Sequence, residues 1–422
     1  MRSQAEGESN WSGNYVYDAV EVHRPSDVDE LRSLLAAAPN VRALGSRHSF
    51  TGIGDAHQLI SLERLPRELS VDADAGKVWV GGPVTYSELA EILNRERAAL
   101  NAMASLPHIS VAGAVTTATH GSGDDKGNLA TSVLDLQVVT SDGEVIEISK
   151  GEPDFDGMVV GLGALGVVTR LSLAVEPYYE MRQWVFEGLS WDAFGQHFDE
   201  LMSSGESVSV FHRFGELIEQ VWIKQRADGD VPGRDDLFDA VPATEDRHPV
   251  LDGDPVNCTP QLGRPGPWSE RLPHFRSGFT PSAGEEIQSE FFVARADAPA
   301  AVDALRGLSD SIRPLLLVCE LRTIAPDDLW LSPQHGRPTV GIHFTWRRRQ
   351  AEVEALLVEI EDRLAPFGAR PHWAKLFTAT AESIAPQYAR RTDFLELRER
   401  LDPRGALIND WLRKTLIGNP SL

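Results

Sequence analysis

Residues 41–50 read VRALGSRHSF, a short apolar run that ends in a turn with an arginine and a histidine side by side. The apolar residues predict a strand over VRALG, and the small residues that follow it predict a turn. Because a turn requires only small residues, the basic pair Arg47 and His48 indicates that a group is bound or bonded at this place.

Residues 103–123 read MASLPHISVAGAVTTATHGSG and form a second segment of small residues, without a single Asp, Glu, Lys or Arg. Such a segment suits backbone that passes close to a flat ligand or its phosphates, because glycines allow close approach and successive amides bind anions. Taken alone, each segment is typical of an ordinary glycine-rich loop. Two such segments in one part of the chain, both with histidine, favour a ligand site.

The composition is that of a globular protein, and its charge argues against nucleic acid as a partner. The 422 residues carry 63 acidic and 40 basic side chains, a net charge of -23, which repels phosphate backbones. Two cysteines, Cys258 and Cys319, exclude a disulfide framework and fit a reducing compartment. No apolar run approaches the roughly 20 residues that span a bilayer, and the N-terminus is polar. We therefore expect a cytoplasmic protein without membrane partners.

The first part of the chain alternates short strands with helices. Capping-box patterns at Ser26 with Asp29 and at Thr85 with Glu88 predict two helix starts. The run 133–149 contains two β-rich stretches joined by Asp-Gly, which predicts a hairpin. Further strands are expected over VRALG, LISLERL and KVWVGGPV. These elements predict an α+β domain.

Beyond this part the composition changes. This change and the length of the chain predict two domains. Aromatic strand-like segments are followed by a loop-rich stretch over about 227–284 and then by the strands LLLVCELRT and TVGIHFTWR and the helix AEVEALLVEIEDRLAPFG. We expect a first domain over 1–178, a substrate domain over 179–375, and a C-terminal segment, 376–422, that returns to the first domain.

A G-x-G-x-x-G pattern lies at Gly161, Gly163 and Gly166. The pattern binds a dinucleotide only when a helix follows it, because the pyrophosphate sits on the helix N-terminus. The residues that follow, VVTRLSLAVEP, alternate and are rich in β-branched side chains, so they predict a strand. A glycine-rich turn that enters a strand is the favoured interpretation.

Two strongly apolar strands predicted in the second domain each contain polar side chains. Period two places Glu320 and Arg322 on one face of their strand, and His343 and Thr345 on one face of theirs. A surface ion pair is the simpler interpretation of such residues, but the apolar surroundings favour a pocket lined by these groups. Lys375, in RPHWAKLF, is a candidate desolvated lysine.

The motifs LGSRHSF, MASLPHISVAG, ATHGSG and GALGVVT together resemble the FAD-binding domain of the vanillyl-alcohol-oxidase family of flavoproteins. The resemblance continues through VNCTPQLGRPGPWSERLPHFR, CELRT, HFTW and RPHWAK, so it covers nearly the whole chain. Within the family it is closest to the bacterial alditol (xylitol) oxidases, which are relatives of the aldonolactone oxidases. It implies an α+β fold with a PCMH-type FAD-binding domain and a substrate (cap) domain whose mixed or antiparallel sheet is flanked by helices.

The resemblance implies FAD bonded covalently through His48, a single tether because no cysteine occurs between His48 and Cys258. Arg47 stands where the close relatives have glycine, and it is expected either to contact a phosphate or to point to solvent. The residues implied in cofactor binding are Ala43, Leu44, Gly45, Ser46, Arg47, His48, Ser49, Ser105, Ser110, Gly113, Thr117, Ala118, Thr119, His120, Val168 and His372.

The resemblance also implies a polyol site formed by Ser105, Glu320, Arg322, Thr345 and Lys375. Arg322 and Lys375 are expected to stabilise a developing alkoxide, and Glu320 to hold Arg322 in place, which makes these three the catalytic candidates. Whether Lys375 or Arg322 takes the hydroxyl proton stays open at this point. His343 is expected to orient the flavin or the substrate.

The implied function is an FAD-dependent oxidase of acyclic sugar alcohols such as xylitol and sorbitol. A hydride passes from the terminal CH-OH to flavin N5, and O2 reoxidises the flavin, which gives an aldose and H2O2. The alternative is a sugar-1,4-lactone oxidase or dehydrogenase on the same fold. A hydrolase or metal enzyme finds no support because HExxH, GxSxG and P-loop patterns are absent from the sequence. We expect a monomer without a metal.

Overall fold

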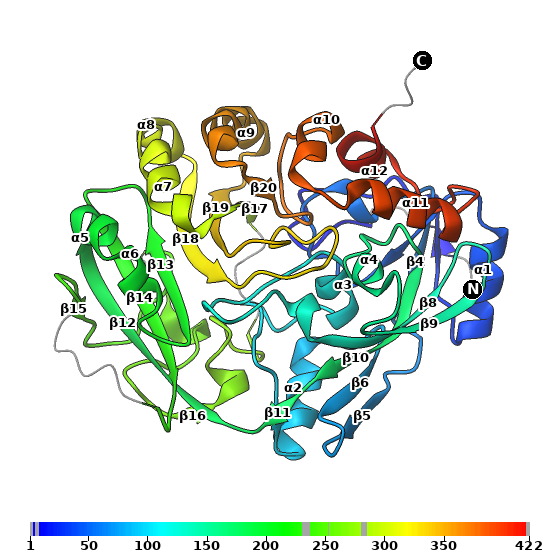
Figure 1. Cartoon of the computed structure of the whole chain (residues 1–422), viewed down its shortest axis with the longest axis horizontal. Helices are drawn as coiled ribbons and strands as arrows, with labels where there is room; N and C mark the ends of the chain where they lie inside the picture. Colours follow the sequence, from blue (N-terminus) through cyan, green and yellow to red (C-terminus); the bar gives the residue numbers. More distant parts are fainter. Residues whose placement is uncertain (1–2, 5–7, 230–236, 252, 280–284, 419–422) are drawn as a thin grey trace.

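The fold consists of two sheet-containing parts that lie side by side, with the C-terminal helices beside the first part (Figure 1). The computed structural model describes residues 3–4, 8–229, 237–251, 253–279 and 285–418.

The first part contains two sheets. The smaller one has, in spatial order, the strands β1 (Ser3–Gln4), β2 (Glu21–His23), β4 (Gln58–Ser61) and β3 (Val41–Leu44). In it β2, β4 and β3 run parallel. The larger, antiparallel sheet has β5 (Leu69–Asp72), β6 (Lys77–Gly81), β10 (Val167–Ala174), β8 (Val133–Val139) and β9 (Val145–Ser149). The helices of this part are α1 (Val28–Ala37), α2 (Tyr86–Arg95), α3 (Val111–Thr116) and α4 (Phe155–Val159).

One of the two predicted helix starts is confirmed and the other is wrong by one residue. Thr85 and Glu88 form the capping box at the start of α2. For α1 the N-cap is Asp27 instead of Ser26, because the Asp27 carboxylate accepts the backbone N–H of Glu30 at 2.8 Å. The Ser26 hydroxyl, one residue farther out, donates to the Glu30 carboxylate at 3.1 Å.

The predicted hairpin and the predicted strand after the glycine pattern are both confirmed. Strands β8 and β9 pair in antiparallel fashion, and Gly143 in their turn has φ of +78°, a conformation that glycine adopts without strain. Strand β10 begins at Val167, directly after Gly166, so the pattern has no following helix on which a pyrophosphate would sit.

The second part is built on a nine-stranded antiparallel sheet. Its strands are, in spatial order, β15 (Val241–Pro242), β12 (Glu180–Ser190), β14 (Leu217–Arg226), β13 (Ser207–His212), β18 (Leu316–Ile324), β19 (Thr339–Arg347), β17 (Glu286–Ala294) and β20 (Arg370–Pro371), with β16 (Gly266–Pro267) against β12. Its helices are α5 (Trp191–Gln196), α6 (Phe198–Met202), α7 (Ala298–Arg306), α8 (Ser309–Ile312) and α9 (Gln350–Leu364). The remaining elements are the pair β7 (Ala98–Ala99) and β11 (Glu176–Pro177) and the C-terminal helices α10 (Ala381–Ile384), α11 (Arg391–Leu401) and α12 (Asp410–Leu412).

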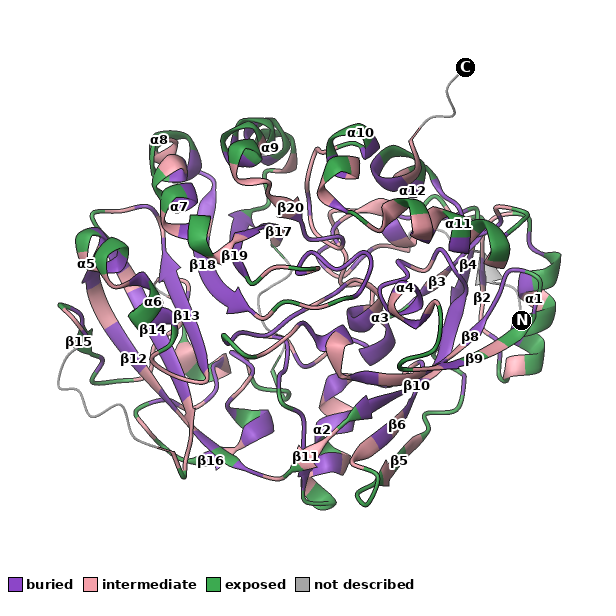
Figure 2. Cartoon of the chain, viewed as in Figure 1, coloured by how far each residue is buried: buried purple, intermediate pink, exposed green. Residues whose placement is uncertain are grey.

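The two faces of this large sheet differ in chemistry. On the face toward the helices, Leu321, Ile342 and Phe344 pack in one hydrophobic core with residues of α7 and α9. The intervening residues point to the opposite face, toward the first part of the chain, because successive side chains of a strand alternate. Figure 2 shows that the central strands are buried along most of their length, so this second face is buried as well.

The loop-rich stretch predicted over about 227–284 contains short strands and 3₁₀ turns in the residues that are described, while 230–236, 252 and 280–284 lie outside them. The division of the chain at 178 and 375 stays a prediction. Among the helices of the described part, none combines the length and the apolar character that crossing a bilayer requires.

Arg42, on β3, is a buried cation that binds four backbone carbonyls. Its guanidinium donates to the oxygens of Ile53 at 2.7 Å, Leu162 at 2.5 Å, Gly163 at 2.8 Å and Leu407 at 3.0 Å. The residue thereby joins β3, the turn at Ile53, the glycine turn before β10 and the C-terminal segment.

Replacing Arg42 by Met leaves these carbonyls buried without a donor, and each unsatisfied group costs about 1–3 kcal/mol. We expect Arg42→Met to lower the free energy of unfolding by at least about 3 kcal/mol in denaturant titrations. Arg64→Met, at an exposed position, is the matched control and should change it by less than about 0.5 kcal/mol. Equal effects of the two substitutions would contradict the role of Arg42.

Candidate active site

A cavity of about 820 Å³ lies between the two small-residue segments of the first part and the second face of the large sheet. Such a volume lies within the ~300–1,000 Å³ typical of ligand sites. The sequence-predicted residues that line it are Ala43, Leu44, Gly45, Ser46, Arg47, His48, Ser49, Ser105, Ser110, Gly113, Thr117, Thr119, His120, Glu320, Arg322, Thr345, His372 and Lys375. Ala118 and Val168 are not among the lining residues, because both side chains pack in the hydrophobic core of the first part.

The two small-residue segments are joined to each other at this cavity. The backbone N–H of Ser110 donates to the hydroxyl of Ser46 at 3.0 Å, and the N–H of Ser46 donates to the Ser110 hydroxyl at 3.3 Å. A Cβ atom added to Gly45 would lie 2.5 Å from the Ser110 Oγ, so the contact requires glycine. The glycines of both segments therefore bring backbone against backbone along one wall of the cavity.

His48 lies in this wall with its ring stacked on Trp11. The two ring centroids are 5.1 Å apart at an interplanar angle of 25°. Burial, with a smaller contribution from His108, lowers the pKa of His48 to about 4. The imidazole is therefore neutral at neutral pH, the form in which its nitrogen is a nucleophile. Sequence reasoning missed Trp11, which reaches the turn from the N-terminal segment.

Arg47 fits neither of the two sequence-based interpretations, because its guanidinium forms an ion pair with Glu8. Its backbone has φ of +60°, the left-handed region that glycine favours. This conformation suits glycine best, and an arginine there costs roughly 1 kcal/mol. His48, the next residue, lines the cavity.

The opposite wall carries the polar residues of β17, β18 and β19. In the sheet register, His343 lies directly between Glu290 on one neighbouring strand and Glu320 on the other. The sequence predicted that Glu320 and Arg322 share one face of their strand and that His343 and Thr345 share one face of theirs. The register is consistent with both predictions, and all four residues line the cavity.

Glu290 is the charged residue at the centre of the site, and sequence reasoning missed it. Its carboxylate is fully buried and contacts Lys375 Nζ at 2.6 Å, His120 Nε2 at 3.0 Å and an Arg322 nitrogen at 3.3 Å. Burial alone would raise the pKa of Glu290, but the charge of Lys375, the contact with His120 and the charge of Arg322 hold it well below its usual value. The period-two pattern that selected Glu320 also applies to Gln288 and Glu290 in EIQSEFFVA, so the signal was present in the sequence.

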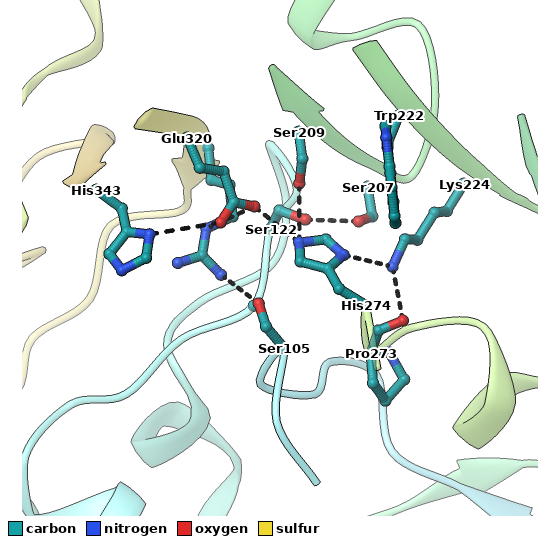
Figure 3. Close-up of polar contacts among 12 residues, drawn as sticks. Ser105, Ser122, Ser207, Ser209, Trp222, Lys224, Pro273, His274, Glu320 and His343 are labelled. Carbon is teal, nitrogen blue, oxygen red and sulfur yellow. Dashed lines mark hydrogen bonds and ion pairs between the residues drawn. The ribbon is translucent and has the colours of Figure 1, made fainter. Parts of the chain in front are cut away.

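The guanidinium of Arg322 is held between two carboxylates and a hydroxyl. Its Nε lies 3.3 Å from Glu320, and a terminal nitrogen donates to the Ser105 hydroxyl at 3.2 Å (Figure 3). Burial would raise the pKa of Glu320, but the charge of Arg322 and the contact with His274 lower it far below its usual range. Burial lowers the pKa of Lys375, and Glu290 opposes that effect. Two carboxylates thus neutralise two cations at one wall of the cavity.

His343 lies between Gln288 and Glu320. Its Nε2 contacts the Gln288 side-chain oxygen at 3.1 Å, whereas its Nδ1 lies 3.7 Å from a Glu320 carboxylate oxygen and makes no hydrogen bond among the described residues. Burial, followed by the charge of Lys375, lowers the pKa of His343 to about 3, so the ring is neutral. The assignment of the proton to Nε2 leaves a free lone pair on Nδ1.

Glu290 also lies with His120 and His372 in a cluster whose ligand atoms are within 4.8 Å of one another. A divalent cation there would meet the positive charges of Lys375 and Arg322, both already bound to the same carboxylate. The cluster is therefore better suited to orient these cations than to hold a metal.

Comparison with known proteins identifies the family. Residues 21–149 match an FAD binding domain, and residues 285–415 match the D-arabinono-1,4-lactone oxidase domain. The chain is 46% identical over 415 residues to an alditol oxidase from a Streptomyces species, which covers 97% of this chain and 99% of that protein. The chain belongs to the alditol oxidase family. It is an FAD-dependent oxidoreductase, as the sequence predicted.

More distant relatives of the chain include sugar-lactone enzymes. An L-gulono-1,4-lactone dehydrogenase of Mycobacterium tuberculosis is 28% identical, over 97% of this chain and 98% of that protein. A crystal structure of cholesterol oxidase from B. sterolicum superimposes with a TM-score of 0.81 at 12% identity, over 99% of this chain and 97% of that one. The predicted fold, α+β with a PCMH-type FAD-binding domain and a substrate domain, is confirmed.

Glu290→Gln keeps the shape of the central side chain and removes its charge. We expect a loss of about 3 kcal/mol in the free energy of unfolding, because the partly buried Lys375 loses its counter-ion and the buried Arg322 loses one of its two. Glu359→Gln, at an exposed position of α9, is the control and should be neutral in the same denaturant titration. A Glu290→Gln protein as stable as the control would show that the carboxylate does not hold the site together.

Proposed function

We propose that the protein oxidises acyclic sugar alcohols such as xylitol and sorbitol at a terminal CH-OH, with O2 as the electron acceptor, to an aldose and H2O2. The observation that carries this proposal is the pair formed by the buried Arg322 and the partly buried Lys375, both held by Glu290 at the cavity beside Ser105. Two cations at one point suit a hydroxyl that becomes an alkoxide.

The residues of the first part fit FAD. The small-residue wall over 43–49 and 105–119, with its backbone exposed to the cavity at Gly45 and Gly113, would hold the flavin and its phosphates. FAD bound there supplies a two-electron acceptor for the hydride of the substrate. The neutral, half-buried His48 would hold it covalently through a ring nitrogen that replaces one hydrogen of the flavin's methyl carbon, with the two electrons released taken up by the flavin.

On the opposite wall, Arg322 and Lys375 would donate hydrogen bonds to the reacting hydroxyl oxygen. Glu320, Ser105 and Thr345 would bind further hydroxyls along the polyol, since each presents an acceptor or a hydroxyl at the cavity. A row of such groups favours a chain of hydroxyls over an apolar substrate.

The proton of the reacting hydroxyl needs an acceptor with a free lone pair. Arg322 is unsuited, because guanidinium groups stay protonated in proteins. Lys375 donates to Glu290 at 2.6 Å, and an ammonium paired in this way has further N–H donors for the substrate but no lone pair. The neutral His343 keeps a lone pair on Nδ1, which makes no hydrogen bond among the described residues and lies 3.7 Å from Glu320, a carboxylate that would stabilise the resulting imidazolium. We therefore assign the proton to this nitrogen and the electrostatic role to the two cations.

A sugar-1,4-lactone oxidase or dehydrogenase is the second candidate, because residues 285–415 match the lactone oxidase domain. The 46% identity with the alditol oxidase, against 28% with the lactone dehydrogenase, favours the polyol. We further propose that the protein is a cytoplasmic monomer without nucleic-acid or membrane partners. The surplus of acidic residues supports the part of this proposal that concerns nucleic acid, because it repels phosphate backbones.

The covalent bond is tested by acid precipitation. We expect the yellow colour to stay with the precipitated protein, and His48→Ala to release the flavin into the supernatant while still binding it at neutral pH. His57→Ala is the control, because His57 is an exposed histidine of the same region. Its precipitated protein should keep the yellow colour. Release of flavin from the unaltered protein would overturn the attachment at His48.

The substrate class is tested with peroxide detection in air. Xylitol or sorbitol should generate H2O2, and Arg322→Ala should lower the rate by at least about 100-fold, since it removes a charge that acts on the developing alkoxide. The flavin spectrum of Arg322→Ala should be unchanged. Turnover of a 1,4-lactone without turnover of any polyol would instead establish the second candidate.

A further inference from the structure

Lys224, on β14, is a fully buried lysine that does not line the cavity. Lys224 lies two residues after Trp222, so the two side chains share a sheet face. Trp222 is level with Ser209, and Ser209 is level with Arg322, so this is the face of the active-site groups. In Figure 3 it lies on the far side of His274 from Glu320. It belongs to neither set of residues that the family resemblance implies, and a buried lysine requires a specific reason.

The contacts of Lys224 match the hydrogen-bonding capacity of an ammonium group. Its Nζ lies 2.6 Å from the carbonyl oxygen of Leu272, 3.0 Å from that of Pro273 and 3.1 Å from Nδ1 of His274. An ammonium has three N–H donors and no acceptor, so all three partners accept. Burial lowers the pKa of Lys224 to about 7, while the charge of Glu320 raises it.

The proton position on His274 follows from this contact. When Nδ1 accepts from Lys224, Nε2 carries the ring hydrogen and donates it to the Glu320 carboxylate, 2.7 Å away. The ring stands edge-on to Phe211 at 5.5 Å and to Trp222 at 5.3 Å, so neighbouring side chains hold it in its plane. Glu320 then receives one donor from His274 and faces Arg322 Nε at 3.3 Å.

We propose that Lys224 is a positioning residue that fixes the tautomer of His274 and, through it, the orientation of Glu320 against Arg322. The proposal deepens the proposed function and rests on it only for the effect on turnover. A neutral lysine has two N–H donors, so one of its three acceptors would lose its partner. A His274 ring with hydrogen on Nδ1 would turn the lone pair of Nε2 toward the Glu320 carboxylate, and the two acceptors would repel each other.

Kinetics of flavin reduction in the holoenzyme test the effect on turnover. Lys224→Met, which keeps the length of the side chain, should slow flavin reduction at saturating xylitol by about tenfold or more. In a His274→Gln background the same substitution should change the rate by less than about twofold, because its effect passes through His274. Lys77→Met is the matched control. Lys77, on β6, is paired with Asp135 and does not line the cavity, so its substitution should leave the rate unchanged.

A rate of Lys224→Met equal to that of the unaltered enzyme would overturn the proposal. Losses that simply add in the double variant would also overturn it, since they would show that Lys224 does not act through His274. Flavin content and melting temperature are measured on every variant, so that a failure to fold is recognised.

The tautomer is measured directly and without substrate by ¹⁵N NMR of the unaltered holoenzyme, with the His274 signals assigned by their loss in His274→Gln. We expect hydrogen on Nε2 and a bare Nδ1. Hydrogen on Nδ1 would overturn the proposal even if Lys224→Met does not fold. If the unaltered enzyme is not reduced by any polyol, the proposed function fails, while this NMR measurement still decides the role of Lys224.

Discussion

The site depends on one buried carboxylate, that of Glu290. It is fully buried on β17 and bridges Lys375, Arg322 and His120, which come from three separate segments of the chain. Because His120 belongs to the FAD-binding half, this cluster also joins the two halves at the cavity. Two buried cations without such a partner would be strongly destabilising. The close approach is possible because residue 341 is glycine: a Cβ there would lie 2.9 Å from a Glu290 oxygen.

The arrangement of charges follows from the two faces of the large sheet. One face is apolar and packs against helices, while the other carries carboxylates, cations and imidazoles in register across β17, β19 and β18. Positive and negative groups balance within this buried layer. At buried positions, fixed cations act more strongly on a developing negative charge than they would in water. The protein thus places a preorganised polar wall opposite the backbone wall that fits the flavin.

The sequence predicted well what depends on local pattern. Period two selected Glu320 and Arg322, and the glycine pattern was assigned to a turn before a strand because β-branched residues follow it. Residues whose roles depend on long-range contacts were missed. Trp11, which stacks on His48, Arg42, which binds carbonyls up to 365 residues away, and His274, which lies in a loop, have no local signature. Glu290 is the exception, since it had the same strand pattern as Glu320.

The departures from the predictions have physical reasons that the sequence alone does not show. Ala118 and Val168 occur among small or apolar residues near the cavity, but their side chains pack into a core. Arg47 was expected at a phosphate or in solvent, and Glu8, 39 residues earlier, binds it instead.

The central claim is that Arg322 and Lys375, held by Glu290, present a terminal carbinol of a polyol to the flavin. Anaerobic stopped-flow mixing of the enzyme with xylitol and with xylitol deuterated at its terminal carbons measures this step most directly. We expect flavin bleaching with xylitol, and bleaching that is several times slower with the deuterated compound, because the terminal C–H bond breaks as the flavin is reduced. Equal rates for the two compounds, or no bleaching with either, would contradict the claim.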